Sequence, residues 1–95
     1  MKKQEYILAT QVNGTWYYIK RIQSYDWDDI FRPTDSMWQA TLFDTKEKAK
    51  RILDKIKNQI NGIYEPTDFF QTLPKIPQTA WKAYKANFIP AFEEI

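Results

Sequence analysis

The apolar and polar positions first form two strand-like runs, Glu5–Val12 and Thr15–Gln23, on either side of Asn13-Gly14. Both runs are rich in Tyr, Ile, Val, Thr and Trp, which suit a pleated surface. An Asn-Gly pair favours a two-residue type I′ turn because both residues tolerate positive φ. The pattern therefore predicts a β-hairpin, paired from Val12–Thr15 at the turn to Tyr6–Arg21 at the far end.

In this register each face of the hairpin carries apolar side chains. Leu8 and Ile19 lie on one face, and Ala9 and Tyr18 lie on the other. Both faces therefore need covering. We expect one helix to cover the first face and aromatic rings of the last third of the chain to cover the second. These rings are Phe69, Phe70, Trp81, Tyr84, Phe88 and Phe92.

Helical periodicity is strongest over residues 45–61. Asp44 is a suitable N-cap, and Glu47 three residues later completes a capping-box pattern. Asn61-Gly62 supplies a C-terminal stop because glycine accepts the left-handed conformation. One apolar stripe recurs at helical spacing, formed by Ala49, Ile52, Leu53, Ile56 and Ile60.

The remaining segments give weaker patterns. Residues 24–35 are polar and acidic, which predicts a connection, and Ser36–Phe43 alternate as a third strand would. A short helix is predicted over Gln78–Asn87, starting near Pro77, because Ala80, Trp81, Tyr84 and Phe88 recur at helical spacing. Residues 63–64 and 68–73 fit either a strand or a loop. The fold class predicted for residues 1–95 is a single α+β domain, with an antiparallel sheet of three to four strands packed on one main helix and a short C-terminal helix.

Composition removes most catalytic chemistry. The 95 residues include no Cys and no His, which excludes zinc fingers, haem ligation, Cys nucleophiles and Ser-His-Asp triads. Ser24 and Ser36 lie outside any nucleophile-elbow motif, and Gly14 and Gly62 are too far apart for a phosphate-binding loop. We therefore expect a non-enzymatic protein with no cofactor, metal or small-molecule substrate.

The chain also lacks the patterns of membrane or secretory segments. No apolar run approaches the roughly 18 residues of a membrane span. The basic start is followed by an apolar run that Thr10, Gln11 and Asn13 interrupt, which does not suit a signal peptide. We expect a cytoplasmic protein without membrane contact.

The net charge is only +2, but the predicted helix is strongly basic. Its cations could contact phosphates of a nucleic acid. The alternative is a solvated face, with Glu47–Arg51 and Asp54–Lys57 or Asp54–Lys50 pairs. The candidate nucleic-acid contacts are Lys46, Lys50, Lys55 and Lys57.

An acidic cluster, Asp26, Asp28 and Asp29, precedes the predicted third strand. Several oxygens could suit calcium, but the segment has neither the glycine nor the terminal glutamate of an EF-hand loop. A solvated turn is the favoured interpretation. A second interpretation is contact with a basic partner surface, including helix 45–61 of another copy.

Aromatic residues make up 17% of the chain, which is the least ordinary feature of its composition. They could pack in the core, anchor a protein interface or stack on bases. We select Trp16, Tyr18, Trp27 and Trp38 as candidate protein-interface residues.

The order of elements also resembles known proteins. A hairpin with Tyr17-Tyr18, an acidic aromatic loop, a short strand and the run Phe43-Asp44-Thr45-Lys46-Glu47-Lys48-Ala49 resembles small phage and prophage proteins of Gram-positive bacteria. The resemblance covers residues 5–61 and rests on structural motifs. It implies a phage-type accessory protein and assigns no site residues. The expected function is protein–protein interaction, with a host or phage protein or by homo-oligomerisation; the alternative is nucleic-acid binding.

Overall fold

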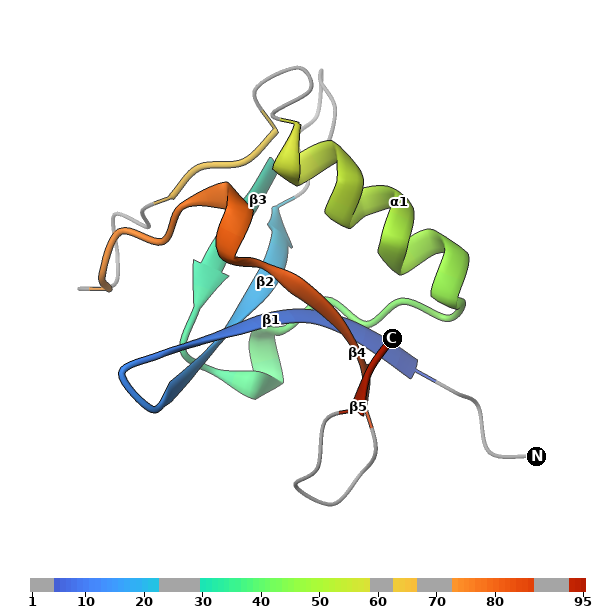
Figure 1. Ribbon diagram of the computed structural model, residues 1–95, viewed down its shortest axis with the longest axis horizontal. Coiled ribbons are helices and arrows are strands. Elements are labelled where there is room, and N and C mark those ends of the chain that lie inside the picture. Colours follow the sequence, from blue (N-terminus) through green and yellow to red (C-terminus); the bar gives the residue numbers. More distant parts are fainter. Residues whose placement is uncertain (1–4, 23–29, 59–62, 67–72, 87–92) are drawn as a thin grey trace.

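A computed structural model describes residues 5–22, 30–58, 63–66, 73–86 and 93–95 of the chain. The described strands form one antiparallel sheet in the order β3-β2-β1-β4-β5, and α1 lies across one face (Figure 1). The predicted α+β class is confirmed. The elements are β1 (Glu5–Val12), β2 (Thr15–Ile22), β3 (Ile30–Thr34), the 3₁₀ helix η1 (Met37–Gln39), α1 (Lys46–Lys57), the 3₁₀ helix η3 (Gln78–Ala80), β4 (Lys82–Ala86) and β5 (Glu93–Glu94).

The N-terminal hairpin forms around the predicted turn. Asn13 has φ 51° and Gly14 has φ 83°, so both turn residues adopt the positive values that a type I′ turn requires. Pairing continues in the predicted register from Val12–Thr15 to Ala9–Tyr18. The turn chemistry therefore sets the alignment of β1 and β2.

Beyond that point β1 and β2 separate, so the predicted pairs Leu8–Ile19 and Tyr6–Arg21 are wrong. Residues 41–43 lie between the two strands instead. The Thr41 amide donates to the Ile19 carbonyl at 2.9 Å, and Phe43 exchanges two 2.8 Å backbone bonds with Tyr6. Each diverging strand also gains an outer neighbour, since β1 pairs with β4 and β2 pairs with β3.

The main core lies between α1 and the first face of the sheet. Ala49 and Ile56 are the fully buried residues of the predicted helical stripe, and Ile52 and Leu53 pack at its margin. Ile60 lies outside the described residues. The sheet and the following segments supply Tyr6, Leu8, Ile19, Phe31, Phe43, Ile63, Tyr64, Ile76, Trp81 and Ala83.

The boundaries of α1 differ from those predicted. Thr45, rather than Asp44, is the N-cap, because its hydroxyl accepts a 3.2 Å bond from the Lys48 amide. Asp44 forms a 3.0 Å ion pair with Lys48 Nζ. The helix ends at Lys57 rather than near residue 61, and the predicted Asn61-Gly62 stop lies outside the described residues.

The prediction of a third strand over Ser36–Phe43 is wrong. The strand beside β2 is β3, within the segment predicted as a connection. It includes Pro33, which lacks an amide proton. The Ile19 carbonyl accepts a bond from the Thr41 amide on the side of β2 that faces away from β3. Ile19 and its strand partner Pro33 are therefore a pair without hydrogen bonds between them, so the missing amide proton of Pro33 costs no bond to β2.

The predicted helix over Gln78–Asn87 is also wrong. Within the described part of this segment only the single turn η3 is helical, and β4 follows it. The apolar spacing that favoured a helix serves both faces of a strand. Trp81 and Ala83 belong to the core beneath α1, whereas Tyr84 packs with the second face. The other rings expected to cover that face, Phe69, Phe70, Phe88 and Phe92, lie outside the described residues.

Candidate functional site

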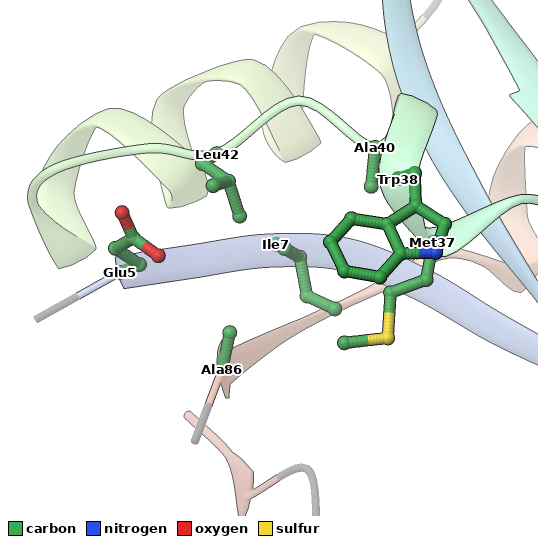
Figure 2. Close-up of a pocket in the computed structure, with 7 residues that line it drawn as sticks. All are labelled: Glu5, Ile7, Met37, Trp38, Ala40, Leu42 and Ala86. Carbon is green, nitrogen blue, oxygen red and sulfur yellow. The ribbon is translucent and has the colours of Figure 1, made fainter. Parts of the chain in front are cut away.

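The second face of the sheet carries a smaller apolar cluster and an open groove. Ile7, Ala9 and Tyr18 form the buried part of this cluster. Next to it is a concavity of about 390 Å³, shown in Figure 2. We call it the Trp38 groove, and its lining residues are Glu5, Ile7, Met37, Trp38, Ala40, Leu42 and Ala86.

A short polar network shapes the chain that carries Trp38. The Thr34 hydroxyl donates to the Gln39 side-chain oxygen at 2.8 Å and accepts the Ser36 amide at 3.1 Å. These bonds compete with an extended backbone and turn the chain into η1. Thr34 is fully buried, so its two partners also satisfy a polar group inside the protein.

The segment after η1 is held by backbone bonds. Thr41 bonds to β2 through its amide, and its hydroxyl accepts the Arg21 amide at 2.7 Å. Phe43 then bonds to β1. Because these contacts fix the wall of the groove on two strands, little backbone ordering is left for a ligand to impose.

Three large apolar side chains of this wall face solvent. Trp38 is 97% exposed, Met37 is 52% exposed and Leu42 is 54% exposed. In Figure 2 the indole of Trp38 extends along one side of the groove, with Met37 next to it and Leu42 further along. Contiguous exposed apolar groups of this kind mark interaction surfaces.

The floor of the groove is formed by paired strands. Ile7 of β1 is 2% exposed, and Ala86 comes from the neighbouring β4. Glu5 lies at the opposite end from Trp38 and supplies the only ionisable group among the lining residues within the described ranges (Figure 2). It makes no ion pair with any other described residue. The groove can hold apolar side chains, and its described lining includes one carboxylate.

The other predicted interface residues do not share this exposure. Trp16 is half-buried and packs edge-on against Tyr84, with ring centroids 5.5 Å apart. Tyr18 is only 7% exposed, and burial raises the pKa of its hydroxyl. Trp27 lies outside the described residues. Of the predicted set, Trp38 is therefore the residue that the described structure presents to solvent.

The candidate nucleic-acid contacts are exposed but do not form one surface. Lys46, Lys50 and Lys57 occur at i, i+4 and i+11, which places them on one flank of α1. Lys55 lies on the other flank. The acidic residues Glu47 and Asp54 occupy the outer crest between the flanks, and the predicted intrahelical pairs of these two carboxylates are absent from the described part of the chain.

The described residues contain no group of three or more carboxylates placed to hold a metal ion. The predicted acidic cluster, Asp26, Asp28 and Asp29, lies outside them. Within the same described ranges, no helix has the length and apolarity to cross a membrane.

The chain was compared with known proteins at three levels. No family model, curated protein or solved structure matches it. The geometry of the Trp38 groove is therefore the basis for its functional interpretation.

The sequence contained part of the signal for this groove. The alternating pattern of residues 36–43 placed Trp38, Ala40 and Leu42 on one side of the segment, and all three line the groove. The contributions of Glu5 and Ala86 were missed, because they depend on the pairing of β1 with β4.

Proposed function

We propose that this chain is a non-enzymatic interaction protein that binds a segment of another protein in the Trp38 groove. The observation that carries the proposal is an almost fully exposed Trp38 beside Met37 and Leu42 at the edge of a concavity. Tryptophan is enriched among residues that dominate binding energy at interfaces. A role in a phage or prophage, in the cytoplasm, is part of the same proposal.

Selection from a random peptide-display library on the immobilised full chain tests this function. We expect enriched peptides to bind the original chain and to lose at least about tenfold in affinity on Trp38→Ala, as for an interface anchor. Trp16→Phe is the control, because it changes a tryptophan outside the groove. Enrichment that Trp38→Ala leaves intact would contradict the proposal.

A fold control accompanies this test. The Trp38 side chain is almost entirely solvated, so its truncation removes little buried area and leaves the melting temperature unchanged within about 2 °C. Loss of binding then reports on the surface. A larger shift measured by thermal denaturation would show that Trp38 has a structural role.

A further inference from the structure

The Trp38 groove is too small to bind a large globular surface. Its volume of about 390 Å³ is near the lower end of the roughly 300–1,000 Å³ of ligand pockets. A stable interface between globular proteins buries about 800 Å² on each partner, which seven lining residues do not supply. A short segment that inserts a few side chains matches this size.

The strands that form the floor of the groove, β1 and β4, already have hydrogen-bonded neighbours. β1 pairs with β4 over Glu5–Ala9 and with Phe43 at Tyr6. On the far side of β4, the Tyr84 and Lys85 positions pair with β5. A ligand therefore cannot add a strand to the described floor, and recognition must use side chains.

This requirement selects the conformation of the ligand. A helix satisfies its own backbone bonds and presents apolar side chains at i, i+3 or i+4 to a groove. A polyproline segment also avoids strand pairing, but it docks between several aromatic residues. Trp38 is the single aromatic residue among the described residues that line this groove, so the described geometry favours a helix.

Charge specifies the ligand further. Glu5 ends an otherwise apolar groove, and no cation is among the lining residues that the structure describes. A lysine or arginine on the bound segment would pair with this carboxylate. A second copy docked symmetrically would instead bring a second Glu5 to the same face, and the described lining offers no cation to compensate it.

We propose that the groove binds a short amphipathic helix whose apolar side chains pack against Trp38 and whose lysine or arginine pairs with Glu5. This proposal rests on the proposed function and adds the chemistry of the partner. The small contact area gives an expected dissociation constant of about 1–100 µM.

The test uses peptides selected on the full chain, measured by fluorescence anisotropy and circular dichroism. We expect apolar residues at helical spacing, a basic residue at one end and increased helicity on binding. Glu5→Lys should weaken these peptides roughly tenfold, because it replaces an attractive pair with a repulsive one. The same variant should bind more tightly to peptides in which the basic residue is replaced by Glu.

Glu47→Lys, the same charge change on the exposed crest of α1, is the matched control and should leave binding unchanged. Glu5→Gln, which removes the charge without reversing it, repeats the test if Glu5→Lys does not fold. Trp38-dependent peptides that are acidic, proline-rich or insensitive to Glu5 would overturn the helix–charge inference and keep the proposed function. Dimerisation through Trp38 would overturn both proposals, because a second copy of the chain, rather than a segment of another protein, would occupy the groove.

If no peptide depends on Trp38, both proposals fail. Trp38-dependent binding to anionic lipid vesicles without peptide enrichment also overturns both, because it assigns the groove to a lipid surface.

Discussion

Tyr64 is the residue whose ionisation the fold alters most. Burial raises the pKa of its hydroxyl to about 12, and the adjacent Trp81 indole partly offsets the rise. The hydroxyl donates a 2.6 Å bond to the Ile76 carbonyl, so the neutral phenol has a specific partner. The Trp81 ring packs edge-on at 6.1 Å, and its buried Nε1 makes no regular hydrogen bond in the described structure.

This environment predicts alkaline sensitivity. The folded pKa lies above the ordinary value of 10.0, so the stabilisation is complete below about pH 10 and is lost as pH rises toward 12. The free energy of unfolding should fall by about 3 kcal/mol across this range from Tyr64 alone. Urea denaturation at several pH values measures the fall.

Tyr64→Phe is the control for this prediction. It removes the titration and should flatten the alkaline part of the curve, at a cost of about 1 kcal/mol at neutral pH for the lost bond. Burial also raises the pKa values of Tyr18 and Tyr84, with Glu94 adding to the rise at Tyr84, so a smaller dependence remains. An unchanged slope would show that Tyr64 is not the responsible group.

At the scale of single elements, local chemistry predicted the hairpin and the main helix. Asn13-Gly14 determines its own turn geometry, and the stripe containing Ala49 and Ile56 needs only one apolar surface to pack against. These signals act over a few residues, so they are readable without knowledge of the rest of the chain.

Elements that depend on distant partners were misassigned. The polar, acidic residues 24–35 predicted a connection, but β3 forms there by pairing with β2, and the position of Thr41 on the other side of β2 shows why Pro33 is tolerated. The segment Gln78–Asn87 has apolar residues at helical spacing, but β1 pairs with Lys82–Ala86 as a second neighbour, and this pairing overrides the helical preference. The Trp38 groove depends on local pattern and on distant strand pairing. The sequence therefore predicted Trp38 as an interface residue but missed the contributions of Glu5 and Ala86.

The N-terminus of α1 provides a test at this scale. Thr45→Ala removes the bond to the Lys48 amide and should lower the free energy of unfolding by about 1 kcal/mol. Asp44→Ala removes only a surface ion pair, which is worth about 0.5 kcal/mol or less. Chemical denaturation of both variants compares them. A greater cost for Asp44→Ala would restore Asp44 as the cap.

For the whole molecule, the prediction that both sheet faces need covering explains why many aromatic residues pack within the fold. The first face is enclosed by α1 and the segments that contribute Tyr64 and Trp81. On the second face Trp16, Ala40, Tyr84 and Ala86 pack against the apolar cluster, whereas Trp38 remains exposed. Most aromatic residues of the described ranges thus pack within the fold, and the proposed function depends on the exposed Trp38.

The charge distribution gives a second test at this scale. Because the lysines of α1 are split by acidic residues, we expect weak binding to single-stranded oligonucleotides that is lost between about 50 and about 200 mM salt. Replacing Lys46, Lys50 and Lys57 together by Glu should remove this binding, whereas Lys55→Glu should have a smaller effect. Fluorescence anisotropy measures both. Retention of binding at the higher salt would support the nucleic-acid hypothesis instead.

The position of β1 at the centre of the sheet has a consequence for biosynthesis. One neighbour, β2, follows it immediately, but β4 is translated about 75 residues later. At roughly 5–20 residues per second, the nascent chain holds Ile7 and Leu8 without their final neighbours for several seconds. A ribosome-bound chain lacking β4 should therefore be protease-sensitive, and folding should proceed as a late, concerted step rather than from the hairpin outward.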